Sequence, residues 1–172
     1  MIFQILGGGE TKQDKAHEKP NVQRSFMHHK GDKRMHCISV GTPEGIHYAF
    51  DLQYGSVLST WSGNIFFDAT QMWSSRGSEQ FGRTGSFATT LYGANEFAIL
   101  KDPNENWPVN TENIQFDSYK FATNGLPFFT HKIQGATVIN KFFPNETDRG
   151  LTRKISIDSL LRFRLRLFER GW

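Results

Sequence analysis

Short apolar runs of strand length recur along most of the chain, and turn residues separate them. The alternation is clearest in GIHYAFDL, residues 45–52. A period of two is typical of a β-strand, whose successive side chains point to opposite faces. The pattern puts Ile46, Tyr48 and Phe50 on one face and His47, Ala49 and Asp51 on the other.

Several other segments are also short and rich in apolar residues, which predicts a mainly β protein. They are MHCISV (35–40), SVLSTW (56–61), FATTLYG (87–93), EFAIL (96–100), GATVINKFF (135–143) and LTRKISI (151–157). NIFFDATQMW (64–73) fits either a short strand or an irregular aromatic loop. Short strands joined by turns favour an all-β fold, so we predict an antiparallel β-sandwich, with a super-sandwich as one form of it.

Two turn signals support this prediction. Asn124-Gly125 separates QFDSYKFA from FFTHKIQG, and such a dipeptide between apolar runs suits a tight hairpin. GTPEG, residues 41–45, combines a proline with two glycines between two expected strands.

The two ends of the chain differ from its middle. Residues 11–20, TKQDKAHEKP, are charged and nearly free of apolar side chains, so we predict a linker or solvated arm over residues 1–20 and one β-rich domain over 21–172. In residues 161–167, leucine and phenylalanine alternate with Arg162, Arg164 and Arg166. A strand of this kind needs a partner beyond it, so we expect the chain to be a fragment.

Composition excludes several classes of site. The chain has 172 residues, 16 of them Phe, and a formal net charge of +3. The lone Cys37 excludes an intramolecular disulfide, C-x-x-C-H haem attachment and paired-cysteine zinc sites. Basic residues cluster at 30–34 and 162–170, which we interpret as solvated ends or cationic strand faces, not as a nucleic-acid site. No segment has the roughly 20 apolar residues of a membrane helix, and we predict no cofactor.

One glycine-rich region gathers aromatic and charged side chains that a core does not require. It contains Trp61, Asp68, Trp73, Arg76 and Glu79. An exposed indole can stack on the C–H face of a sugar ring, while carboxylate and guanidinium groups bond its hydroxyls. The alternative is structural, with the tryptophans closing the end of the sandwich and Asp68 pairing with Arg76.

Histidines form a second group of candidates. His28 and His29 are adjacent and therefore point to opposite sides of a strand, and no convincing third metal ligand accompanies any histidine pair, so we predict no metal site. His47 is retained as a ligand-binding candidate. If the protein is an enzyme, His47 or His131 is the expected acid or base.

The chain from about Lys19 to Ile157 resembles a domain of large secreted bacterial proteins that also carry c-type cytochrome, sugar-dehydrogenase-like or glycoside-hydrolase-like modules. The resemblance is carried by ISVGTPEGIHYAFDL (38–52), WSG (61–63), FDAT (67–70), MWSSRG (72–77), YKFATNGLPFFTHKI (119–133) and GLTRKI (150–155). It implies an accessory domain in the periplasm or outside the cell, with a fold similar to the super-sandwich of sugar mutarotases. It supplies no catalytic residues.

Three functions follow as hypotheses. The first is a non-catalytic module that binds glycan or packs against neighbouring domains of its parent protein. The second is a fragment of a mutarotase-like or lyase-like enzyme, and the third is a structural spacer.

Overall fold

A computed structural model of the chain describes residues 18–74, 82–85, 88–100, 102, 104–108, 112–145, 150–159 and 164–165. The strands of the two large sheets are β1 (Asn21–His29), β2 (Asp32–Gly41), β3 (Ile46–Asp51), β4 (Ser56–Ser62), β7 (Thr89–Thr90), β9 (Ile114–Phe121), β10 (Pro127–Ile133), β11 (Ala136–Asn145) and β12 (Gly150–Asp158). The smaller elements are β5 (Phe67–Asp68), α1 (Thr70–Ser74), β6 (Arg83–Thr84), β8 (Phe97–Ala98) and β13 (Arg164–Leu165).

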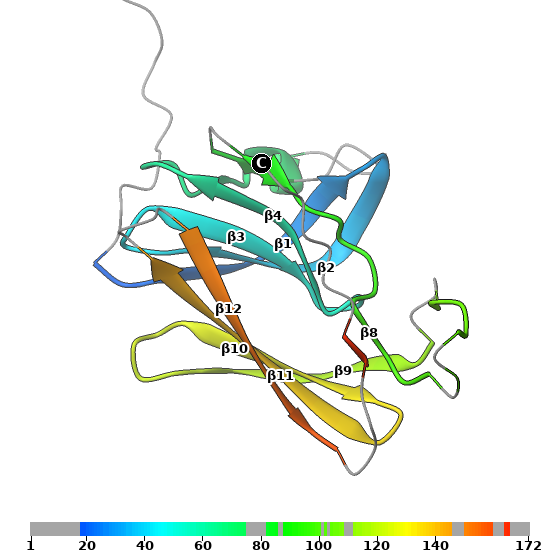
Figure 1. The fold of residues 1–172 in the computed structure, drawn as a ribbon. Helices are drawn as coiled ribbons and strands as arrows, with labels where there is room; N and C mark the ends of the chain where they lie inside the picture. Colours follow the sequence, from blue (N-terminus) through cyan, green and yellow to red (C-terminus); the bar gives the residue numbers. More distant parts are fainter. Residues whose placement is uncertain are drawn as a thin grey trace, which may run out of the picture.

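The protein is an all-β sandwich, which confirms the predicted fold class. One sheet has the order β1-β2-β3-β4-β7 and the other has the order β12-β11-β10-β9. The first sheet packs above the second in the view of Figure 1. Neighbouring strands are antiparallel, and most of them follow one another in the sequence. The predicted hairpin at 115–135 is therefore present, and β3 and β4 form another.

The tightest turns lie at positions whose local sequence is a weaker turn signal than Asn124-Gly125. Lys30-Gly31 and Gln134-Gly135 each join two strands, and both residues of each pair have positive φ, at 51° and 93° and at 47° and 89°. This is the geometry of a two-residue type I′ hairpin loop, which glycine adopts without strain. Asn124-Gly125 instead lies in a longer connection, residues 122–126, in which Asn124 Oδ1 accepts a hydrogen bond from the Leu126 amide at 3.2 Å.

β1 was not among the predicted strands. Its face toward the interior carries Ser25, Met27 and His29, all buried. Two of these three side chains are polar, so hydropathy does not alternate along the strand although burial does. The opposite orientation of His28 and His29 is confirmed, because His28 is exposed and His29 is buried.

Aromatic contacts between the two sheets form the main core. Phe50 on β3 stacks on Phe129 of β10, with ring centroids 4.3 Å apart. Tyr48 and Phe142 meet at 4.6 Å beside them. Aliphatic side chains complete this cluster, among them Ile38, Val40, Val57 and Leu126. Tyr48 and Phe50 are two of the three residues that the alternation in residues 45–52 assigns to one face.

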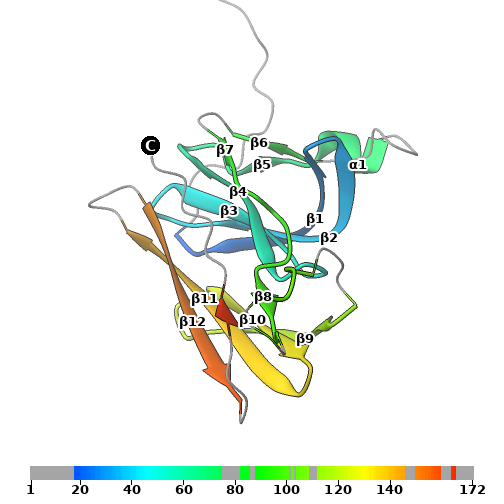
Figure 2. The ribbon, with the colours of Figure 1, turned by 45° about the vertical axis from the view of Figure 1, so that its right-hand side comes forward.

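The first sheet also buries its other face. All six residues of β3 are buried, so both faces of that strand are covered. The second cluster contains Met27, Cys37, Ala49, Leu58, Trp61, Phe66, Phe67 and Met72. Its cover comes from β5, β6 and α1, which Figure 2 shows on the side away from the second sheet. The segment 64–73 thus forms a very short strand and a short helix, and the helix was not predicted.

The predicted strands at 87–93 and 96–100 are reduced to two-residue strands, β7 and β8. Of the predicted strand at 161–167, only Arg164 and Leu165 lie among the described residues, and they pair with β8. The arm predicted for residues 1–20 lies almost wholly outside the described residues, and β1 begins at Asn21.

Candidate functional site

Trp61 is not an exposed indole on which a sugar ring could stack. Its side chain is 2 % exposed and belongs to the second core cluster. The indole Nε1 donates a hydrogen bond to the Phe66 carbonyl at 2.6 Å, and the two rings are nearly parallel at 8°. Trp61 therefore holds the β4–β5 connection against the sheet and offers no face to a ligand.

His47 is likewise a structural residue. Its Nδ1 accepts a hydrogen bond from the Thr42 amide at 3.2 Å, and its Nε2 donates to the Gly63 carbonyl at 2.8 Å. Burial lowers the pKa of His47, which favours the neutral ring that this bonding requires. With both nitrogens occupied by backbone groups, His47 joins two loops and has no atom left for a ligand.

The remaining predicted site residues are only partly within the described residues. Asp68 is exposed, and its Oδ1 accepts a hydrogen bond from the Thr70 amide at 2.9 Å, so it caps α1. Hydrogen bonding by Thr70 lowers the pKa of Asp68. Trp73 has a described backbone within α1 but no described side chain, and Arg76 and Glu79 lie outside the described residues. Their proposed role stays a prediction.

A histidine within hydrogen-bond reach of a carboxylate would favour the enzyme hypothesis. His131 lies between the sheets, where its Nε2 donates to the Leu52 carbonyl at 2.7 Å and its Nδ1 has no partner. Asp51, on the same strand as His47, accepts from the turn amides of Gln53 and Tyr54 and from Arg34. Neither His47 nor His131 thus bonds a carboxylate among the residues that the structure describes.

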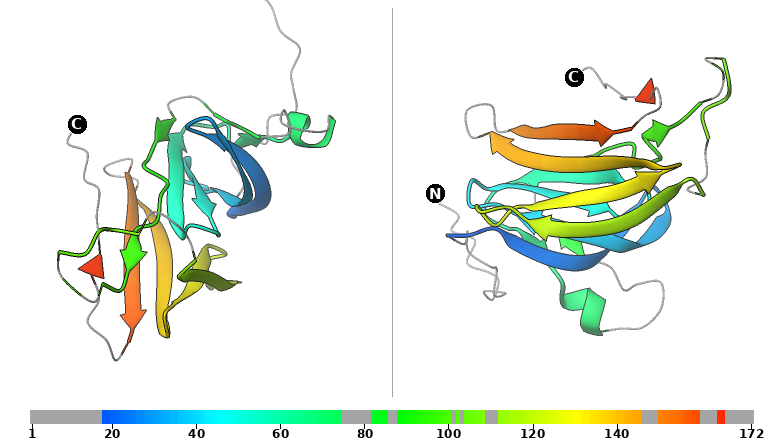
Figure 3. Two further views of the ribbon diagram at one scale, coloured as in Figure 1. Left: turned by 90° about the vertical axis from the view of Figure 1, so that its right-hand side faces the viewer. Right: turned by 90° about the horizontal axis from the view of Figure 1, so that it is seen from below.

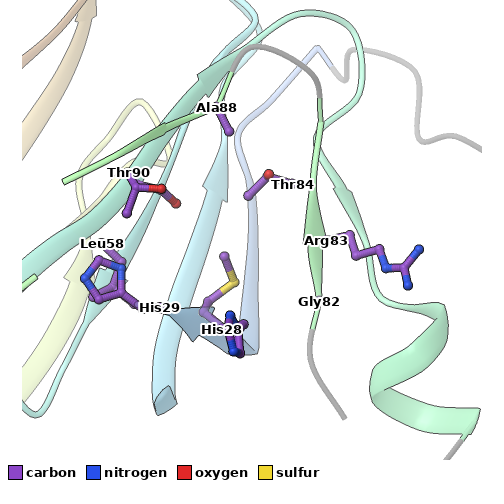
Figure 4. A pocket seen from close by; sticks show the side chains of 10 residues that line it. His28, His29, Leu58, Gly82, Arg83, Thr84, Ala88 and Thr90 are labelled. Atoms are coloured by element: carbon purple, nitrogen blue, oxygen red, sulfur yellow. The ribbon is translucent and has the colours of Figure 1, made fainter. Parts of the chain in front are cut away.

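A cavity of about 230 Å³ opens where the first sheet curls back on itself. β1 and β7 are the edge strands of this sheet, yet His29 at the end of β1 donates from Nε2 to the Tyr92 carbonyl, just beyond β7, at 3.1 Å. β6 lies at the same seam, because the Gly82 amide donates to the Phe26 carbonyl at 2.7 Å. The lining residues are Met27, His28, His29, Leu58, Ser59, Gly82, Arg83, Thr84, Ala88 and Thr90, shown in Figure 4.

We call this space the seam cavity. Three hydroxyl side chains line it, those of Ser59, Thr84 and Thr90, and Figure 4 shows Thr84 on the β6 side facing Thr90. Arg83 points away from the other labelled side chains in the same view. No described lining residue is acidic. The lining combines hydrogen-bonding hydroxyls and imidazoles with the apolar side chains of Met27, Leu58 and Ala88.

Ser59 is the most informative residue of the seam cavity. It is 8 % exposed, and its Oγ has no hydrogen-bond partner in the structure. A buried hydroxyl without a partner costs about 1–3 kcal/mol, so such groups are rare unless something else satisfies them. The Oγ is closed off from solvent in the present rotamer, so a molecule in the cavity becomes its partner once the Ser59 side chain turns about χ1 toward the cavity.

His29 closes one end of the seam cavity. It is 3 % exposed, and burial lowers its pKa, although the bond to the Tyr92 carbonyl opposes that shift. Lys30 donates to the same carbonyl at 3.1 Å. The neutral imidazole thus links edge strand β1 of the curled sheet to Tyr92, just beyond the opposite edge strand, β7.

No local pattern in the sequence could have found this site. Its residues come from β1, β4, β6, β7 and their flanks, and each hydroxyl is an ordinary strand residue. Only the curl of the sheet brings them together.

The rest of the described chain offers few alternatives. It contains no group of three or more His, Cys, Asp and Glu side chains placed to hold a metal ion. Within the same residues, no helix has the length and apolar character to cross a membrane. Comparisons with protein families, with curated proteins and with solved structures found no match to this chain.

Proposed function

We propose that the protein is a non-catalytic, carbohydrate-binding accessory module, and that the seam cavity receives one sugar unit. The observation that carries this proposal is the unpartnered Ser59 hydroxyl in a cavity lined by further hydroxyls. A sugar hydroxyl both donates and accepts, so it can satisfy serine, threonine and imidazole groups alike.

The size and lining of the seam cavity support this ligand class. At about 230 Å³ it is smaller than the pockets of about 300 Å³ and above that hold drug-sized molecules. Met27 and Leu58 supply apolar surface for the C–H groups of a sugar ring. The small size suits a single unit, such as the end of a glycan chain.

A glycan panel tests the proposal directly. The full chain is titrated with neutral and acidic mono- and oligosaccharides, and binding is followed by amide chemical shifts in NMR. We expect a millimolar or tighter ligand whose shifts map to β1, β4 and β7. Replacing Ser59 with Ala should weaken this binding about tenfold, the equivalent of one hydrogen bond of roughly 1.4 kcal/mol.

Ser56→Ala is the matched control. Ser56 lies on the same strand, is fully buried, and also has an Oγ without a partner, but it does not line the cavity. Its replacement should leave the affinity unchanged. If no saccharide binds, or if Ser56→Ala and Ser59→Ala weaken binding equally, the sugar-binding part of the proposal fails and domain packing remains the better hypothesis.

The setting of the module in a secreted multidomain protein rests only on the resemblance carried by the six sequence blocks between about Lys19 and Ile157. It predicts that the native product is found in the periplasm or outside the cell. Fractionation of the native host, with detection of the full-length product, checks this prediction.

A further inference from the structure

The outer face of the second sheet carries a row of lysines at right angles to its strands. The registers pair Phe128 with both Lys120 and Lys141, and they pair Lys141 with Lys154. The row therefore runs Lys120, Phe128, Lys141, Lys154 across β9, β10, β11 and β12. Figure 3 (right) shows these strands in front, and no other described element crosses them.

We call this surface the lysine row. Its three lysines are all exposed. Adjacent strands lie about 4.8 Å apart, so the Cα atoms of Lys141 and Lys154 are about one strand spacing apart. Lys120 lies two strands away from Lys141, on the other side of Phe128. The row is thus a line of positive charge across the whole width of the sheet.

This arrangement costs stability unless something binds it. Like charges directly opposite on neighbouring strands are destabilising, and Lys141 and Lys154 are such a pair. None of the three lysines has an ion pair with a carboxylate among the described residues. The acidic residues of this sheet, Asp117 and Asp158, lie three or four residues along their strands from the row, about 10 Å or more at 3.3 Å per residue.

Aromatic rings accompany the charges. The Lys141 ammonium lies over the Phe128 ring, 5.1 Å from its centroid. Phe143 is two residues beyond Lys141 on the same outward face and is 42 % exposed. An exposed ring beside cations can contact the C–H face of a sugar while the ammonium groups bind its acidic substituents.

We propose that the lysine row binds a linear acidic polysaccharide, whose carboxylate or sulfate groups neutralise the three ammonium groups. The row is on the opposite sheet from the seam cavity, so this inference stands or fails separately from the cavity's sugar site. An extended acidic polysaccharide carries its charges along one line, as the row does. Binding removes the repulsion between Lys141 and Lys154.

The composition of the row favours this partner over nucleic acid. Single-stranded nucleic acids bind to successive aromatic platforms, one base on each, whereas the ring of Phe128 in the row is already covered by Lys141. Arginine, the preferred residue for bidentate phosphate contacts, is absent from the row.

Affinity measurements against four polymers test the proposal. The full chain is titrated against polygalacturonate, dextran sulfate, a single-stranded oligonucleotide and vesicles of anionic phospholipid at several salt concentrations. We expect binding to one or both polysaccharides that weakens with salt. Preference for polygalacturonate identifies carboxylate as the recognised group, and preference for dextran sulfate identifies sulfate.

The decisive variant replaces Lys120, Lys141 and Lys154 with Gln. Its affinity for the polysaccharide should fall at least about tenfold, and the slope of log K against log salt should fall by about 2. Thermal unfolding checks that the variant is folded, and relief of the repulsion predicts an unchanged or higher midpoint.

The control replaces Lys19, Lys30 and Lys33, which removes the same charge from elsewhere, and it should bind nearly as well as the unmodified chain. An equal loss in the control, no binding to either polysaccharide, or tighter binding to the oligonucleotide or the vesicles would overturn the proposal.

Discussion

Arg153 on β12 forms an ion pair with Glu96, which precedes β8, in the half-buried space at the edge of the sandwich. The same guanidinium donates to Asn140 Oδ1 at 2.7 Å and to the Gly55 carbonyl in the β3–β4 turn at 3.0 Å. Burial raises the pKa of Glu96, although the positive charge of Arg153 opposes the shift. One side chain thus connects the second sheet, the first sheet and the segment before β8.

Arg153→Ala should therefore destabilise the protein by about 3–5 kcal/mol, because it leaves a partly buried carboxylate without its partner. Glu96→Gln should cost less, because the amide still accepts a hydrogen bond from Arg153. Urea unfolding of both single variants and of the double variant measures their coupling. Lys154→Ala, an exposed neighbour on β12, should stay within about 0.5 kcal/mol of the unmodified chain. A loss below about 1 kcal/mol for Arg153→Ala would contradict the structural role.

Removing an unpartnered hydroxyl should stabilise the ligand-free protein. Ser59→Ala and Ser56→Ala each delete a buried Oγ that has no partner, so the free energy of unfolding should be unchanged or rise by up to about 1 kcal/mol. Chemical unfolding without ligand measures this. A clear loss of stability in both variants would show that these hydroxyls are satisfied. If Ser59→Ala raises the free energy of unfolding and also weakens sugar binding, the Ser59 hydroxyl serves binding at a cost in stability.

Trp61→Ala should lower stability by about 3–5 kcal/mol, as expected for truncation of a large core side chain. If Trp61 were an exposed indole that stacks on a sugar ring, as first predicted, Trp61→Ala would change the stability by almost nothing. Thermal and urea unfolding separate the two outcomes. Trp61→Phe keeps a ring against Phe66 but loses the hydrogen bond to the Phe66 carbonyl. Its stability should therefore lie between that of Trp61→Ala and that of the unmodified chain.

Stability should decrease as the pH falls from neutral to mildly acidic. Burial lowers the pKa of His29, His47 and His131 from the ordinary value of 6.5. In this range the unfolded chain binds more protons than the folded one, so the stability present above pH 6.5 is lost as the pH falls through the lowered pKa values. The raised pKa values of Asp51 and Glu96 act in the opposite direction in more acidic solution.

Urea unfolding at about pH 7.5 and about pH 5 measures this dependence. His131→Gln removes one titrating ring and should reduce the difference in unfolding free energy between the two conditions. Ser56→Ala removes no titrating group and should leave that difference as it is. Equal stability at both pH values in the unmodified chain would contradict the prediction.

Local patterns were sufficient to predict the fold class and most of the long strands. Alternation in residues 45–52 assigned Tyr48 and Phe50 to one face, and both side chains lie in the core between the sheets. Cys37 lies within the apolar run 35–40, which was predicted as a strand, and it is buried. These features depend on near neighbours in the chain, so a sequence pattern can express them.

The functional prediction had a different outcome because exposure is not a local property. Trp61 and His47 follow the same alternation as ordinary strand residues, and the sequence could not tell whether their face meets solvent. In the structure, β5 and α1 cover that face. Trp61 is consequently a core residue, while the roles predicted for Trp73, Arg76 and Glu79 remain predictions.

Antiparallel strands with tight turns can be predicted from the sequence alone, because side-chain alternation and turn residues act over a few positions. The positions of the two proposed binding surfaces follow from the tertiary structure instead. The curl of the first sheet places Ser59 beside β1 and β6, and the strand registers of the second sheet align Lys120, Lys141 and Lys154. Curl and register depend on packing between residues far apart in the chain, which no local pattern records.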